Sequence, residues 1–290
     1  MSFQPIIPLG GLPGWVLLNK TMPRQTELFN QSPQIERDTE YFEKNIDNIR
    51  TAEALVSDRR LLGVALGAFG LSDDLDSRAL IQQVLESSAS DNRSLANRLA
   101  DERYKKLAGA FGFGEPGLPR TRLAGFATEI TDRFRAMEFE AAVGNSDESL
   151  RLALNARREI VEVLESESTE DAQWFTIMGT PPLRRVFEIA LGLPKSFGQL
   201  DIDRQLENFK EKARDQLGIE TVADLTDKDT LESFVRRYLL RDQIASVQVQ
   251  SSESIALSLL QSAPRISGGG AGFFSANTPT RISVSAGNLF

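Results

Sequence analysis

The sequence predicts an all-α, multihelical protein, and three observations support this class. Apolar residues recur at intervals of three and four along residues 32–248, the spacing of one face of a helix. Ser, Thr or Asp precedes several of these segments and glycine follows several, as expected of helix ends. No sustained alternation of apolar and polar residues marks a strand there, so we expect short strands or extended arms at the termini only.

Residues 1–31 are predicted to form an extended N-terminal arm. Gly10, Gly11, Pro13 and Gly14 mark a turn, and the short apolar segment 15–18 that follows favours a short strand or hairpin. At the other end, residues 249–290 are a Ser- and Gly-rich tail that contains three successive glycines at 268–270. Within this tail residues 280–285 alternate as a strand would, although a disordered tail is the simpler interpretation.

The helical domain, residues 32–248, is expected to begin with Ser32 as N-cap and Pro33 in the first turn. Apolar stripes then predict helices near residues 33–49, 61–69, 80–85, 95–111 and 123–141. Gly144 can end the last of these, and Asn145 with Glu148 forms a capping box for the next helix. Further stripes predict helices near residues 148–164, 181–190, 202–217 and 231–239.

Two segments of this domain resemble each other. Residues 61–71 (LLGVALGAFGL) and 183–193 (LRRVFEIALGL) align without gaps and share five of eleven residues. Asp58 and Thr180, both able to cap a helix, precede them at equivalent places. This similarity suggests a pseudo-duplicated helix-turn-helix unit, with halves at about 32–144 and 145–248.

The composition excludes several kinds of chemistry. A chain of 290 residues can bury a sizeable core, yet it contains no Cys and no His. It therefore cannot form a disulfide, a thiolate nucleophile, a Ser-His-Asp triad or a zinc site with the usual ligands. We expect no cofactor and no metal.

The net charge and the hydropathy of the chain disfavour two classes of partner, nucleic acids and the membrane interior. With 41 acidic against 33 basic side chains the net charge is −8, which disfavours binding to nucleic acid. The longest uncharged apolar stretch, residues 61–71, is too short to span a membrane. The prolines and the short apolar run near the N-terminus also argue against a cleavable signal peptide.

Other motifs are better explained by structure than by a site. The segment 112–117 (GFGEPG) matches a dinucleotide fingerprint, but a helix is predicted before it where that fingerprint needs a strand. Asp73, Asp74 and Asp76 lack the spacing of a calcium loop. Glu138 and Glu140 diverge on a helix, so we expect solvated carboxylates there and no acid-base pair.

The arginine pairs Arg59–Arg60 and Arg184–Arg185 lie close to predicted helix starts, where the helix dipole disfavours cations. Local ion pairs are the preferred interpretation, and docking of a partner protein is the alternative. Together with Trp15, these four arginines are the candidate residues for protein interaction.

Five strings carry a resemblance to a known family: DTEYF with Asn45 and Ile46, LVSDRRLLGVALGAFGL (55–71), LANRLADERY (95–104), RLALNARRE (151–159) and PLRRVFEIALGLP (182–194). They resemble a domain-of-unknown-function family that occurs chiefly in alphaproteobacteria, often beside flagellar genes. The resemblance covers roughly residues 35–245. It implies a helical protein of flagellar biogenesis or structure, and it supplies neither a reaction nor catalytic positions.

The resemblance implies a role in the bacterial flagellum, and no convergent catalytic set is visible in the sequence. We therefore expect a non-enzymatic structural or assembly protein of the flagellum that acts through protein-protein contacts. Its expected partners are flagellar proteins, with self-association as a further expectation, and its expected location is the cytoplasm or the flagellum. The alternative is a cytoplasmic adaptor, chaperone or regulator of flagellar subunit export. A less favoured third hypothesis is a carboxylate-based enzyme.

Overall fold

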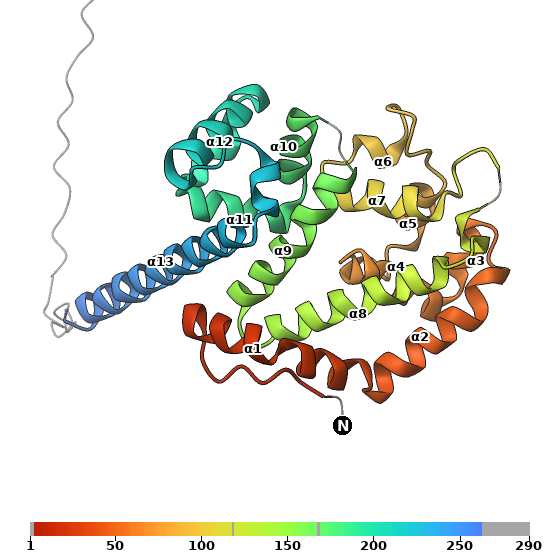
Figure 1. The fold of residues 1–290 in the computed structure, drawn as a ribbon, viewed down its shortest axis with the longest axis horizontal. Helices are drawn as coiled ribbons and strands as arrows, with labels where there is room; N and C mark the ends of the chain where they lie inside the picture. The colour runs from red at the N-terminus through yellow and green to blue at the C-terminus, as the bar shows by residue number, and fades with distance from the viewer. Residues whose placement is uncertain (1–2, 118, 167–168, 263–290) are drawn as a thin grey trace, which may run out of the picture. The chain divides into compact units, whose positions relative to one another are not determined.

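The computed structural model describes residues 3–262, apart from residue 118 and residues 167–168. In this part of the chain it contains thirteen α-helices, five short 3-10 helices and no strand (Figure 1). The predicted all-α, multihelical class is confirmed. The alternating segment 280–285 lies outside the described residues.

The α-helices are α1 (Gly11–Asn30), α2 (Pro33–Asn45), α3 (Ala52–Ser57), α4 (Arg59–Ala68), α5 (Arg78–Leu85), α6 (Leu95–Arg98), α7 (Glu102–Phe111), α8 (Phe126–Gly144), α9 (Glu148–Ser166), α10 (Glu170–Gly179), α11 (Pro181–Leu191), α12 (Ile202–Leu217) and α13 (Lys228–Ser262).

Side-chain caps set several of these boundaries. Asp58 accepts hydrogen bonds from the backbone N–H groups of Arg60 and Leu61, at 2.9 and 3.0 Å, and so begins α4. Asp101 caps α7 in the same way. The stripe at 95–111, predicted as one helix, is therefore divided into α6 and α7. Gly218, with φ of 66°, ends α12 as expected.

Helices α8 and α9 pack against each other and organise the core of residues 1–247 (Figure 1). Helices α2 and α4 pack on α8, whereas α10 and α11 pack on α9. Around α9 an aromatic cluster fills the core, with Trp174 lying 5.8 Å from Phe187 and 6.3 Å from Phe209, measured between ring centroids. One long helix therefore lies at the centre of each of these two groups of helices.

The two similar segments have the same local conformation. Gly70 at the end of α4 and Gly192 at the end of α11 both adopt the left-handed region, with φ of 68° and 66°. In both segments the residue after the glycine donates a backbone hydrogen bond to the carbonyl five residues before it, at 2.9 and 2.8 Å. This is the Schellman arrangement, in which glycine has no steric penalty.

An arginine from a long helix completes each of these helix ends. The Nε of Arg133 on α8 donates to the carbonyl of Ala68, and the Nε of Arg237 on α13 donates to that of Ala190, at 2.7 and 3.0 Å. Ala68 and Ala190 occupy equivalent places in the alignment of the two segments. The geometric match therefore extends beyond the aligned residues to the side chains that satisfy the last carbonyls.

The predicted extended arm and short strand at residues 1–31 are wrong, because residues 11–30 form α1. Pro13 lies in the first turn, where its missing N–H is harmless. The helix begins where Asp147 accepts a hydrogen bond from the N–H of Gly11 at 3.0 Å. The carboxylate of Asp147 also caps α9, a role that the sequence assigned to Asn145. Of the described residues in this segment, only 3–10 and Gln31 lie outside a helix.

At the other end, contacts between residues divide the chain into two units, residues 1–247 and residues 248–290. Helix α13 reaches Ser262, so residues 249–262 of the predicted tail are helical. Residues 263–290 lie outside the described part.

Candidate functional site

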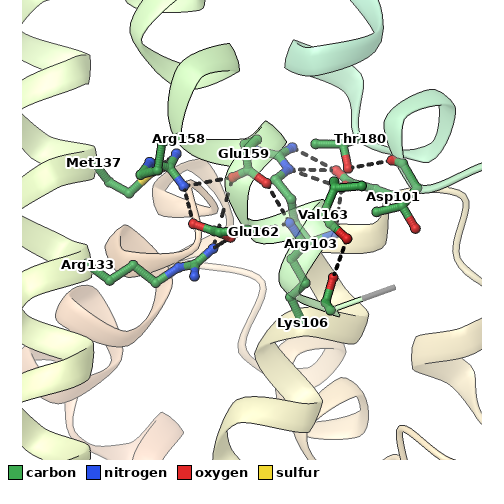
Figure 2. A network of polar contacts seen from close by, with 12 residues as sticks. Asp101, Arg103, Lys106, Arg133, Met137, Arg158, Glu159, Glu162, Val163 and Thr180 are labelled. Atoms are coloured by element: carbon green, nitrogen blue, oxygen red, sulfur yellow. Dashed lines mark hydrogen bonds and ion pairs between the residues drawn. The ribbon is translucent and has the colours of Figure 1, made fainter. Parts of the chain in front are cut away.

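Six charged side chains from three helices meet beside the core. They belong to α7, α8 and α9, and they pair in a single cluster, which we call the ionic cluster. Figure 2 labels all of its members except Glu140. Three are cations and three are anions: Lys106, Arg133 and Arg158, with Glu140, Glu159 and Glu162. Burial of so many charges requires that each has a partner of opposite sign.

Arg158 lies at the centre of the ionic cluster. Its Nε contacts Glu140 Oε1 at 2.8 Å, and its Nη1 contacts a carboxylate oxygen of Glu159 and of Glu162, each at 2.8 Å. Burial alone would lower the pKa of Arg158, but the surrounding carboxylates outweigh burial and raise this pKa above its ordinary value. The guanidinium therefore stays charged and joins α8 to α9.

Glu159 is 5% exposed and accepts a hydrogen bond from the Nζ of Lys106 on α7. Burial raises the pKa of this carboxyl, but the charges of Lys106 and Arg158 act in the opposite sense and bring the pKa to about 2. Glu159 is thus an anion across the physiological range, which makes it unsuitable as a general acid or base near neutral pH.

Glu140 is the acid that α8 contributes to the ionic cluster. Burial raises its pKa, and the neighbouring Arg158 opposes this shift. The expectation that Glu138 and Glu140 are solvated is wrong for Glu140, which is 6% exposed. No sequence spacing reveals its partner, because Arg158 lies on the next helix.

An open hollow of about 710 Å³ lies beside the ionic cluster and shares Lys106, Arg133 and Glu162 with it. Its other charged lining residues are Glu102, Lys105, Arg120, Glu129 and Glu165. The lining holds four cations and four anions, so the hollow has no net preference for a ligand of one charge. This balance of charges is more typical of side chains that hold helices together than of a group of catalytic residues.

Within the described residues, no three His, Cys, Asp or Glu side chains converge so as to hold a metal ion. None of the helices described combines the length and apolar character that are needed to cross a membrane.

Both arginines of the first predicted pair make ion pairs, but with acids 17 and 22 residues away in the chain and not with a neighbouring acid. Arg59 contacts Asp76 at 2.6 Å, and Arg60 contacts Asp38 at 3.1 Å. The guanidinium of Arg60 also lies 4.4 Å from the centroid of the Tyr41 ring. Both arginines line the same hollow of about 520 Å³ next to α4.

The second arginine pair divides between two roles. Arg184 contacts Glu188 at 2.7 Å and donates to the side-chain oxygen of Gln205 at 2.6 Å, which ties α11 to α12. Arg185 is exposed, and no ion pair or hydrogen bond joins it to the residues that the structure describes. The structure does not bring the two pairs into one site, and their role in docking a partner stays a prediction.

Trp15 is not available to a partner, so its selection as an interaction residue is wrong. The side chain is fully buried, its Nε1 donates to Glu232 at 3.1 Å, and Arg157 lies 5.5 Å from its ring. Trp15 instead fastens α1 to α9 and α13.

The surface that the sequence reasoning missed lies on α13. Leu240, Ile244 and Val247 are 46%, 59% and 59% exposed, although they follow a stripe of fully buried residues. We call these three residues the α13 face. The sequence contained a signal for this face. Its three residues are spaced by four and three, and they form a second apolar stripe that is offset around the helix from the preceding stripe of Phe234, Val235, Tyr238 and Leu239.

These observations define a multihelical protein with an ionic cluster beside its core and an apolar helix face on its surface. The chain belongs to the family described as "Protein of unknown function (DUF1217)", whose model matches residues 68–231. The whole ionic cluster lies within this span, and the α13 face lies beyond it.

The fold is similar to that of protein AGR_C_984 from Agrobacterium tumefaciens, a structural genomics target with a crystal structure. The TM-score is 0.67 at 22% sequence identity, and the match covers 83% of this chain and 99% of the other. This likeness concerns the fold. A comparison with curated proteins found no match.

Proposed function

We propose that this protein is a non-enzymatic structural or assembly component of the bacterial flagellum that acts through protein-protein contacts. The flagellar context is supported by the resemblance of five strings to a family encoded beside flagellar genes. The contact mode is supported by the side chains themselves, since the buried charges pair with one another and an apolar face is exposed.

The α13 face is the observation that carries the contact mode. Three large apolar side chains on one side of a helix expose about half of their surface to water. Single exposed apolar residues are ordinary, but a group on one helix face is typical of a surface that a partner covers. Helix-in-groove and helix-on-helix recognition both use apolar residues at this spacing.

Localisation tests the proposal. An affinity tag inserted between Asn92 and Arg93, in an exposed turn after α5, leaves both termini free. Flagellated cells that express this copy are fractionated into purified basal bodies and soluble complexes. Recovery in the basal-body fraction together with rod or hook proteins supports a structural role.

The same fractions test the adaptor alternative. A soluble complex with one flagellar subunit, with none in the basal body, would replace the structural role by that of an export adaptor or chaperone. If neither fraction contains a flagellar protein, both forms of the flagellar proposal fail.

A further inference from the structure

We infer that the α13 face is a self-association surface, on which the same helix of a second copy of this chain packs. The inference rests on the contact face of the proposed function, but not on the flagellar location. Three independent features of α13 lead to it: the exposure of its residues 243–247, its composition and its heptad spacing.

Helix α13 changes its environment along its length. Phe234, Val235, Tyr238 and Leu239 are at most 1% exposed, whereas all five residues from 243 to 247 are exposed. A helix that is exposed on every side receives no stabilisation from a core. The helix nevertheless continues to Ser262.

The composition does not favour an isolated helix. Residues 243–262 contain six serines and four Val or Ile residues, which together make up half of the segment. Serine competes for backbone hydrogen bonds, and β-branched residues lose side-chain freedom in a helix. Isolated helices of this length are marginal in water even with good helix formers, so this one requires a packing partner.

The spacing indicates that the partner is another helix. Leu240, Ile244 and Val247 are separated by steps of four and three, which is the a/d spacing of a coiled coil. Ile244 then occupies an a position between Leu240 and Val247 at d positions.

The charge pattern selects a second copy as that helix. Residues 243–262 contain a single charged residue, Glu253, in a chain of net charge −8. An oppositely charged partner would find little to pair with on this segment, whereas two identical neutral helices do not repel each other. The acidic body, by contrast, disfavours contact between copies elsewhere.

Sedimentation equilibrium of the purified full-length protein tests the inference. The wild-type protein is expected to increase in mass with concentration, from 32.1 kDa towards twice that value. Ile244→Glu places a charge at the centre of the α13 face and should weaken dimerisation at least about tenfold, because two buried apolar side chains are lost from the contact. Ile244→Leu should dimerise as the wild type does.

Leu123→Glu is the matched control, since Leu123 is 57% exposed but lies far along the chain, in the connection that precedes α8. It should dimerise normally. A wild type that is monomeric at every concentration, an Ile244→Glu variant that dimerises like the wild type, or a Leu123→Glu variant that is equally impaired would overturn the inference. Any of these results leaves the flagellar location to be decided by the fractionation above.

Discussion

At the scale of single residues, the charged side chains of the ionic cluster connect neighbouring helices. Arg158 contacts carboxylates of α8 and of its own helix, and Lys106 brings α7 to the same acids. Burying an ion pair gains little net stability, but removing one partner leaves an uncompensated charge in a poorly solvated place. The ionic cluster should therefore tolerate single substitutions badly.

Glu159→Gln tests this expectation. The substitution retains the shape of the side chain but leaves Lys106 and Arg158 short of one negative charge. We predict a loss of about 3 kcal/mol in the free energy of unfolding, measured by urea denaturation. Glu40→Gln breaks the exposed pair with Lys44 and should have no measurable effect. Equal effects of the two substitutions would contradict a special role for the ionic cluster.

The pH dependence of stability follows from the same carboxyl. The pKa of Glu159 is about 2 in the folded protein and 4.5 in its ordinary state, so folding favours the anion. Its contribution is complete above pH 4.5 and disappears as the pH falls through about 2. The difference in unfolding free energy between wild type and Glu159→Gln should therefore shrink over this window. A constant difference from pH 6 to pH 3 would refute this prediction.

At the scale of elements, the repeated helix ends of α4 and α11 show how far a sequence pattern extends. Their similarity was visible as five shared residues, and the left-handed glycines and the Schellman bonds follow from them. The capping arginines Arg133 and Arg237 could not be foreseen, because each comes from a helix distant in sequence. A local sequence pattern predicts the local backbone geometry, but it does not predict which side chains from distant helices will contact it.

Substitutions at three glycines distinguish positions that require a positive φ from a position where glycine only lowers helix propensity. Gly70→Ala and Gly192→Ala should each destabilise the protein by about 1 kcal/mol or more, because their φ values are positive. Gly63 lies within α4 with no atom near the position of an added Cβ. Gly63→Ala should stabilise by about 0.5–1 kcal/mol. Thermal unfolding of the three variants measures these stability changes. A loss of stability in Gly63→Ala would contradict the prediction for this position.

Helix α1 shows where the sequence interpretation failed. Trp15, Leu18, Met22, Gln25 and Phe29 have helical spacing and face the core or lie against it, but the three nearby glycines and Pro13 led us to predict a turn. The helix starts because Asp147, more than a hundred residues away, caps Gly11. A cap supplied by tertiary structure cannot be read from the neighbouring residues.

At the scale of the whole molecule, the class of fold and most helices could be predicted from apolar spacing, whereas the candidate site could not. The ionic cluster requires three helices to meet, and the sequence placed Glu140 in solvent. The α13 face appears only when the burial of Tyr238 and Leu239 is compared with the exposure of Ile244. The proposed function depends on the α13 face, and no sequence motif predicts that surface.

The most direct test of the account is the recovery of the Ile244→Glu protein in purified basal bodies, relative to wild type and to Leu123→Glu. If the protein works through the α13 face, Ile244→Glu should be recovered about tenfold less than the wild type, while Leu123→Glu should be recovered normally. Equal recovery of all three proteins would show that the α13 face does not hold this chain in the flagellum, and would contradict the account.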